Sequence, residues 1–355
     1  MRHHFAIQAT KLLALASAIA LAACDDQANG GGAGSRDQIK VVGSSTVYPF
    51  TTLVAEQFVN QNPGMKAPVI ESTGTGAGMK LFCAGVGAAH PDIANASRRM
   101  KLAEFTACGE NGVDRIMEIQ IGLDGIAFAE GKDGPKLQLT PVDLYLALAA
   151  NPKGKPNTAK TWKDVNPALP AIPIQVYGPP STSGTRDAMA ELIMARGCVT
   201  IYPDSINLKD KKPDDFANVC TRVRDDGPYV DAGENDNLIV QKLQSNPNAI
   251  GIFGYSYLEE NQASLVGVPV SGVAPTYETI TSGTYPGARP LFIYVKKAHL
   301  TAIPGLPKFL EAYAAAWDAN GPLVKRGLIA APQAVRDASA AVIKDGTTLE
   351  GRALQ

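Results

Sequence analysis

The architecture of this chain shows most clearly in the stretch Val176-Tyr-Gly-Pro-Pro-Ser-Thr-Ser-Gly-Thr-Arg-Asp-Ala-Met-Ala-Glu-Leu-Ile-Met194. It begins within a mostly apolar run, Ile172–Tyr177, which predicts a buried strand. Gly178 and two prolines then break the strand, and a cluster of small polar residues, Ser181–Thr185, follows. Apolar residues at helical spacing predict a helix that begins near Ser183. The stretch therefore predicts a strand, a polar loop and a helix N-terminus in succession.

A helix N-terminus behind a polar loop is a common place for proteins to bind an anion. The first backbone N–H groups of the helix have no partner within it, and the positive end of the helix dipole lies beside them. Arg186, just inside the helix, adds a planar charged group that suits an oxyanion. Asp187 beside it is favoured by the same dipole, so a ligand role is its less favoured interpretation. An ordinary N-cap explains these residues equally well, and the rest of the chain must distinguish the two.

Two further loops of the same composition occur earlier in the chain. The first loop, Gly43–Thr46, follows a predicted strand at Ile39–Val42, and the second loop, Ser72–Gly78, follows another at Pro68–Glu71. The loop Ser181–Thr185 is the third. A predicted helix begins behind each loop, glycine allows close backbone approach, and hydroxyls are short donors. Because ligands of open α/β sheets bind beyond the carboxyl ends of strands, the first, second and third loops together favour one shared anion site. The anion should be small, since no phosphate-loop or dinucleotide-binding glycine pattern is present.

The order of patterns along the chain indicates an α/β fold. From Asp37 onward, short β-branched runs alternate with helical patterns. The chain leaves about 320 residues beyond its N-terminal region, more than one core usually serves, so two lobes are expected. The apolar segment Ile119–Ala129 is long enough for a strand that crosses between lobes, and Leu291–Val295 is a candidate for the return crossing. Two closing helices, Leu306–Trp317 and Gln333–Lys344, are expected to pack on the first lobe.

The N-terminus resembles the export signal of a bacterial lipoprotein. Basic residues precede an apolar run, Leu12–Ala22, that is too short to span a bilayer and has signal-peptide length. Leu21-Ala-Ala-Cys24 is similar to a lipobox, which implies removal of residues 1–23 and a lipid on Cys24. A plain signal peptide with an incidental cysteine is the alternative. Residues 24–37 predict a flexible tether. A periplasmic, lipid-anchored location is expected, on the inner or the outer membrane.

The cysteines fit an exported protein. Apart from Cys24, the chain has Cys83, Cys108, Cys198 and Cys220, and an even number in an oxidising compartment predicts disulfides. Sequence proximity favours Cys83–Cys108 and Cys198–Cys220, although four cysteines allow three pairings. A zinc site is the alternative, but no two cysteines have Cys-x-x-Cys spacing and none has an adjacent histidine.

Composition argues against several classes of function. The 33 basic and 34 acidic residues nearly balance, and no basic block suggests a nucleic-acid partner. Only His90 and His299 follow the signal peptide, and no carboxylate–histidine cluster has ligand spacing, so no metal or cofactor is expected. Catalysis is not expected either, and a phosphatase-type enzyme is the less favoured alternative. Ser183 offers a hydroxyl, but the Gly-x-Ser-x-Gly pattern of a serine hydrolase is absent.

Four motifs together resemble the periplasmic phosphate-binding proteins of ABC uptake systems. They are Val42-Gly-Ser-Ser-Thr-Val-Tyr-Pro-Phe50, Ser72-Thr-Gly-Thr-Gly-Ala-Gly78, Asp92-Ile-Ala-Asn-Ala-Ser-Arg98 and Ser183-Gly-Thr-Arg186. Asn246–Tyr255 is also similar to that family's late strand. The resemblance extends from Ile39 to the C-terminal helices. It implies a two-lobed, type II periplasmic binding protein fold, each lobe a mixed sheet flanked by helices, with the ligand cleft at the hinge.

The resemblance also implies a domain division and a site. Lobe 1 would comprise residues 38–124 and 290–355, and lobe 2 residues 125–289. The protein would be a monomer that closes on inorganic phosphate and delivers it to an ABC permease in the membrane. The residues implied as donors to the anion are Ser45, Thr46, Thr75, Ser183, Gly184 and Thr185.

Two departures from the family pattern leave part of the site open. The enteric family members have an aspartate, which accepts the proton of phosphate, where this chain has Ser97. They have an arginine where this chain has Pro179. Arg98 or Arg186 is expected to supply that charge, although Arg98 and Arg99 also suit a solvated pair. Sulfate, molybdate or tungstate binding stays an alternative to phosphate, and a sensing role stays an alternative to transport.

Overall fold

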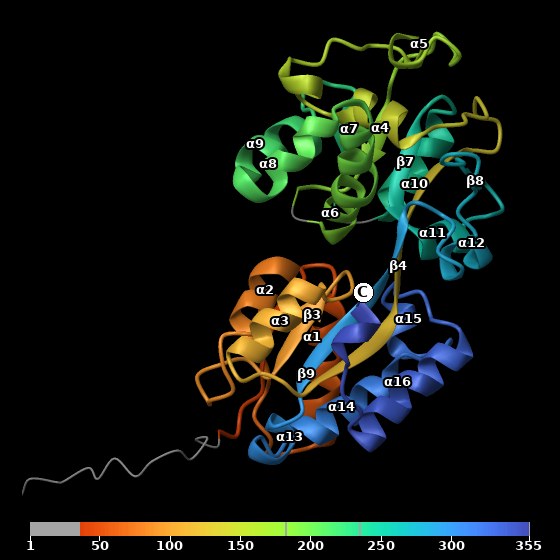
Figure 1. The fold of residues 1–355 in the computed structure, drawn as a ribbon. Coiled ribbons are helices and arrows are strands. Elements are labelled where there is room, and N and C mark those ends of the chain that lie inside the picture. Colours follow the sequence, from red (N-terminus) through yellow and green to blue (C-terminus); the bar gives the residue numbers. More distant parts are fainter. Residues whose placement is uncertain (1–35, 182, 234–235, 355) are drawn as a thin grey trace, which may run out of the picture. The chain divides into compact units, whose positions relative to one another are not determined.

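Figure 1 shows the computed structural model of the chain, which describes residues 36–181, 183–233 and 236–354. The predicted signal peptide, Cys24 and nearly all of the predicted tether lie outside these ranges, as do Thr182 in the third loop and Asn235. Within the ranges described, no helix has both the length and the apolar character needed to cross a membrane. The export and lipidation predictions therefore stay predictions.

The strands of the described residues form one mixed sheet in the order β2-β1-β3-β9-β4-β7-β5-β6, with β8 paired to β4. Figure 1 labels the strands β3, β9, β4, β7 and β8. The neighbours of β1 and of β5 are parallel to them, whereas β4 and β9 pair antiparallel. The α/β fold with mixed sheets predicted from the sequence is thereby confirmed. The strands are β1 Lys40–Gly43, β2 Val69–Ser72, β3 Ile93–Ala96, β4 Ile116–Gly131, β5 Val176–Gly178, β6 Tyr229–Asp231, β7 Ile250–Gly254, β8 Leu265–Gly267 and β9 Ala288–Lys296.

Several helices begin at cap or proline signals of the sequence. Thr140 caps α4, because its hydroxyl accepts the Asp143 N–H while the Asp143 carboxylate accepts the Thr140 N–H. The helices are α1 Tyr48–Gln61, α2 Thr75–Phe82, α3 Leu102–Glu110, α4 Pro141–Leu148, α5 Trp162–Val165, α6 Gly184–Met189, α7 Ala195–Ile201, α8 Ile206–Lys211, α9 Pro213–Phe216, α10 Asp236–Ser245, α11 Tyr255–Glu260, α12 Tyr277–Thr281, α13 His299–Ala302, α14 Leu306–Ala316, α15 Pro322–Lys325 and α16 Gln333–Asp345.

The long strand β4 belongs to both halves of the sheet. The first half contains β2, β1, β3 and β9, and the second half contains β7, β5, β6 and β8. The 16 residues of β4 pair first with β9 and then, over Ile126–Ala129, with β7. The pairing with β9 shifts register between Gln120 and Gly122. A Cβ atom at Gly122 would lie 2.7 Å from the Leu328 side chain, so a larger residue would not fit at this irregularity. The sequence prediction of a long apolar strand here, with a partner strand at Leu291–Val295, is confirmed.

Separate clusters of buried apolar side chains pack on the two halves of the sheet. One joins α1 and α14 to β1, β9 and the first part of β4, and within it the rings of Phe58 and Phe309 meet edge to face at 5.5 Å. The other joins α4, α7 and α10 to β5, β7 and the last part of β4, around the fully buried Tyr145 and Trp162. We propose that these two cores correspond to the lobes expected from the sequence, 38–124 with 290–355, and 125–289.

The structure contains both disulfides favoured by sequence proximity, Cys83–Cys108 and Cys198–Cys220. The first ties the end of α2 to α3, and the second ties α7 to the π-helical turn Ala217–Thr221. Among the described residues no cluster of histidine, cysteine and carboxylate side chains could hold a metal ion. The cysteines are therefore engaged as disulfides rather than as zinc ligands.

The strand predicted for Ile172–Tyr177 is wrong in its boundaries, since β5 covers only Val176–Gly178. Pro173 has no N–H to donate to a neighbouring strand, and it forms only an isolated bridge with Thr161. Gly178 continues the strand instead of breaking it. A Cβ atom there would lie 2.4 Å from the Tyr229 hydroxyl, so glycine is the residue that fits.

Candidate functional site

The third loop leads from β5 into a helix that Ser183 caps. The Ser183 hydroxyl accepts the Thr185 N–H at 3.2 Å, as an ordinary N-cap would. From Gly184 the helix continues through α6 and a π-helical turn, Ala190–Met194, into α7. The cap engages a side-chain oxygen and one N–H group, so it does not conflict with a role of this loop in anion binding.

Arg186 lies against the end of β5. Its guanidinium stacks on the ring of Tyr229 at 4.5 Å, and Nη1 donates to the Pro179 carbonyl at 3.4 Å. The Tyr229 hydroxyl donates to the same carbonyl at 2.5 Å, and burial raises the pKa of Tyr229 to about 12. Arg186 therefore holds a charge beside Pro179, the position where the sequence lacks the arginine of the enteric proteins.

The first loop lies against the third. A Cβ atom added to Gly184 would come within 3.3 Å of Thr46 Cα, so the two loops approach at backbone distance. The Ser45 hydroxyl donates to Asp187 Oδ2 at 3.2 Å. The first loop and the helix that follows the third loop, 142 positions apart for this hydrogen bond, therefore come together in the fold.

The second loop and Ser97 join this group through the first sheet half. Because β1 pairs parallel with both β2 and β3, the carboxyl ends of the three strands meet at one edge. The Gly74 N–H donates to the Gly43 carbonyl at 2.9 Å. Thr75 Oγ1 accepts the Ser97 N–H at 3.1 Å and lies 3.1 Å from the Ser97 hydroxyl. The second loop thus lies beside the first, and Ser97 contacts Thr75 at the N-terminus of α2.

Arg98 is paired with a glutamate six positions further along the chain. Its two terminal nitrogens donate to both carboxylate oxygens of Glu104 on α3, at 2.9 and 2.7 Å. The carboxylate raises the pKa of Arg98 by this hydrogen bonding, against the opposing effect of burial. Arg99 forms the corresponding pair with Glu118. Sequence reasoning missed Glu104 as a partner, and a role for Arg98 toward an anion stays a prediction.

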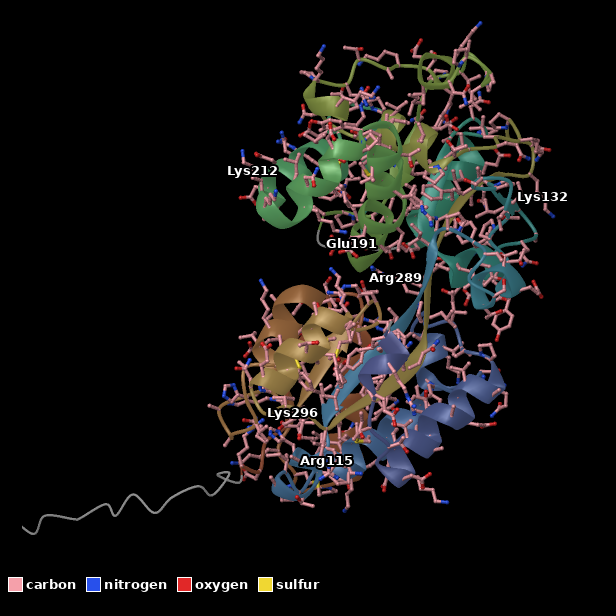
Figure 2. The ribbon with its side chains drawn as sticks, in the orientation of Figure 1. Arg115, Lys132, Glu191, Lys212, Arg289 and Lys296 are labelled. Carbon is pink, nitrogen blue, oxygen red and sulfur yellow. A yellow bond between two sulfur atoms is a disulfide. The ribbon has the colours of Figure 1, made fainter. Side chains whose placement is uncertain are left out.

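Arg289 is the central charged residue that sequence reasoning missed. It is the second residue of β9 and is 7% exposed, and its Nη2 donates to Thr46 Oγ1 at 3.0 Å. Two carboxylates share it: Nε lies 3.3 Å from Asp124 Oδ2, and Nη1 lies 2.5 Å from Glu191 Oε2. Figure 2 labels Arg289 and Glu191. The sequence feature that could have identified Arg289 is a charged residue near the start of a mostly apolar strand, Ala288–Lys296.

Burial raises the pKa of two carboxyl groups near Arg289, those of Asp124 and Asp187. It raises the pKa of Asp124, although Arg289 opposes the shift. It also raises the pKa of Asp187, with the Ser45 hydrogen bond opposing it. Asp124 lies beside the Arg289 guanidinium, which also contacts the first loop.

A cleft of about 670 Å³ lies beside Arg289. It is lined by the second loop, Ser97, Arg98, Glu191 and Arg289, among others. A small oxyanion occupies only part of this volume, so the cleft accommodates it with room for movement.

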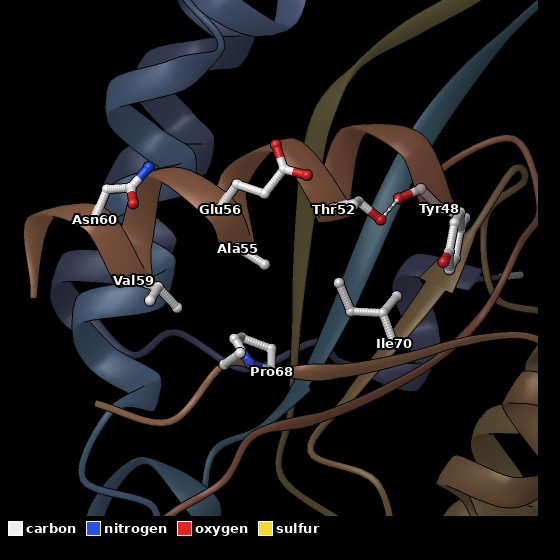
Figure 3. Close-up of a pocket in the computed structure, with 9 residues that line it drawn as sticks. Tyr48, Thr52, Ala55, Glu56, Val59, Asn60, Pro68 and Ile70 are labelled. Carbon is white, nitrogen blue, oxygen red and sulfur yellow. Dashed lines mark hydrogen bonds between the residues drawn. The ribbon is translucent and has the colours of Figure 1, made fainter. Parts of the chain in front are cut away.

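A second groove, drawn in Figure 3, lies between α1 and β2. Its lining is largely apolar: Val59 lies on the α1 side together with Glu56, and Pro68 and Ile70 lie on the opposite side. None of the expected anion donors lines it, and its one charged lining residue is negative. The groove therefore suits an anion poorly.

Comparisons with known proteins agree on one family. Residues 28–315 match the model of the PBP superfamily domain. The chain is 33% identical to Protein SphX of Synechococcus elongatus, over 72% of this chain and 67% of that protein. It is 31% identical to the Phosphate-binding protein PstS of Staphylococcus saprophyticus, over 84% of this chain and 82% of that protein. The crystal structure of a possible phosphate binding protein from Planctomyces limnophilus matches with a TM-score of 0.70 and 28% identity, covering 88% of this chain and 99% of that one.

Proposed function

Because the chain belongs to the PBP superfamily, with PstS and SphX proteins as relatives, we propose that it is an extracytoplasmic phosphate-binding protein. It binds inorganic phosphate and delivers it to an ABC-type permease, without catalysis of its own. The observation that carries this proposal is the approach of the first loop to both the third and the second loop, in a chain whose curated relatives include a phosphate-binding protein.

The proposed site replaces the water shell of the anion with protein donors. Backbone N–H groups and hydroxyls of the three loops supply neutral hydrogen bonds, and arginines supply charge. Since a buried dianion needs all of its oxygens satisfied, one loop alone would not hold it. The residues proposed to bind phosphate are Ser45, Thr46, Thr75, Ser97, Arg98, Ser183, Gly184, Thr185 and Arg186.

Closure about the shared strands is the proposed route of capture. β4 is common to both halves of the sheet and β9 pairs along its first part, so bending there would move the third loop relative to the first and second. The bound form would then dock on the permease as a monomer. A lipid on Cys24 would keep the protein at the membrane through the tether at residues 24–37.

Calorimetric titration tests the proposed ligand. We expect phosphate to bind with sub- to low-micromolar affinity, on the order of −8 kcal/mol. Arsenate, sulfate and molybdate are titrated in parallel from mildly acidic to mildly alkaline pH. Tight binding of sulfate or molybdate without any heat from phosphate would contradict the assignment and favour another tetrahedral oxyanion.

A further inference from the structure

Arg289 combines burial with contact to the first loop. Its side chain is 8% exposed, and Nη2 donates to the hydroxyl of Thr46, one of the proposed phosphate donors. It also lines the 670 Å³ cleft together with Thr75 and Ser97. A guanidinium in this position presents fixed donors where an oxyanion bound by the loops would lie.

The two carboxylates on Arg289 differ in how easily they can leave. Asp124 lies on β4, next to β9, and its side chain is 18% exposed. Glu191 lies on the helix that follows the third loop, and its side chain is 61% exposed. Moving Glu191 into water costs little, because exposed ion pairs are weak. Moving Asp124 away would leave a buried charge uncompensated, so Asp124 acts as the permanent counter-ion.

The helix after the third loop covers the donors of the first sheet half with negative charge. Asp187 and Glu191 are four residues apart and therefore lie on one face of the helix. Asp187 accepts from the Ser45 hydroxyl, and Glu191 accepts from Arg289. An anion that approached the same donors would meet both carboxylates at close range, where like charges repel strongly. Anion binding and the Glu191–Arg289 contact therefore compete.

We propose that Arg289 is a phosphate-binding cation of the cleft and that Glu191 is its internal competitor. In the empty protein Glu191 occupies the guanidinium, and phosphate displaces it while Asp124 keeps Arg289 in place. This inference rests on the proposed function. Its consequence is that Glu191 sets the affinity: the protein binds more weakly than its donors alone would allow, and it releases phosphate more readily.

Exchange of Glu191 tests the competition. Glu191→Gln keeps the size of the side chain and removes its charge, and we expect it to tighten phosphate binding about three- to tenfold in calorimetry. Arg289→Gln should weaken binding at least about tenfold, and Glu191→Gln added to it should bring no gain. Glu311→Gln, on the exposed side of α14, makes the same charge change and should leave affinity unaltered. Unchanged or weaker phosphate binding by Glu191→Gln would overturn the inference.

A second measurement does not depend on how well Arg289 variants fold. In ¹⁵N NMR spectra, the Nε–H signal of Arg289 should shift when inorganic phosphate is added to the unaltered protein. In Glu191→Gln without phosphate it should shift as well, because the guanidinium has lost a partner. If phosphate binds and the Arg289 signal does not shift, this inference is overturned while the proposed function stands. No phosphate binding by the unaltered protein would instead overturn the proposed function.

Discussion

Thr75 provides the narrowest test of the proposed site. Its hydroxyl contacts Ser97 twice and lies at the N-terminus of α2. Thr75→Ala removes a donor to the charged ligand, and we expect phosphate binding to weaken by about 1.5–3 kcal/mol in calorimetric titration. Thr106→Ala removes a comparable exposed hydroxyl from α3, where it bonds only within its helix, and should leave affinity unchanged. Equal affinities for Thr75→Ala and the unaltered protein would remove the second loop from the site.

The pair of Arg224 and Asp226 links stability to pH. Arg224 Nε and Nη2 donate to the two Asp226 oxygens at 2.6 and 2.7 Å, and the Arg224 side chain is 1% exposed. This guanidinium lowers the pKa of Asp226 to about 2. An aspartate whose pKa is lower in the folded state stabilises the fold above its unfolded pKa of about 3.9. That stabilisation disappears as the pH falls through 2.

Replacement of Asp226 should therefore affect both the level and the pH dependence of stability. We expect Asp226→Asn to lower the free energy of unfolding at pH 7 by about 1 kcal/mol, since solvent screens this partly exposed carboxylate. The loss of stability between about pH 4 and pH 2 should become smaller. Urea unfolding at both ends of this range measures each effect. The exposed neighbour Asp225 supplies the control, because Asp225→Asn should keep the original pH profile; an original profile in Asp226→Asn would refute the assignment.

Residue types in the three loops predicted part of the site. The composition of the three loops correctly marked their hydroxyls as neighbours of helix N-termini, because capping depends on residues a few positions apart. The same reasoning could not find the pairing of Arg98 with Glu104 on α3, since two side chains six positions apart meet here across a loop. Whether Arg98 leaves that partner for an anion is a property of the bound state.

At the scale of elements, β5 shows how packing sets a boundary. The strand includes Gly178 because the Tyr229 ring lies over the backbone at that point. Gly178→Ala would place a Cβ atom against that ring, and we expect the free energy of unfolding to fall by about 1–3 kcal/mol. Urea unfolding measures the change. Gly87→Ala adds the same methyl group where nothing lies within 4 Å, and should be nearly neutral. Equal stability of the two variants would show that β5 tolerates a side chain there.

Element types followed from sequence more closely than element ends. The apolar periods of α14 and α16 and the long run of β4 appear in the structure within a residue or a few of their expected limits. The limits of β5 differ, because Pro173 excludes regular pairing and Tyr229, about fifty positions away, favours glycine at 178. Propensity describes a segment, whereas the neighbouring strand decides where pairing stops.

At the scale of the whole molecule, attachment to the membrane depends on the N-terminal cysteine. If Cys24 carries a lipid, Cys24→Ala should move the exported protein from the membrane fraction into the soluble periplasmic fraction, because the acyl chains at this position would be lost. Cell fractionation followed by immunoblotting measures the distribution. Asp26→Ala changes a tether residue two positions away and should stay with the membranes. A Cys24→Ala protein that still sediments with membranes would contradict lipidation.

The sequence by itself determined the features that depend on neighbours along the chain. The α/β alternation, the three polar loops, the cap at Thr140 and the disulfides between nearby cysteines are of this kind. Only the tertiary structure decided which charge meets the first loop. Arg289 lies 243 positions from Thr46 and 98 from Glu191, and the order of strands in the sheet brings them together. Such contacts depend on sheet topology and burial, which no local pattern encodes.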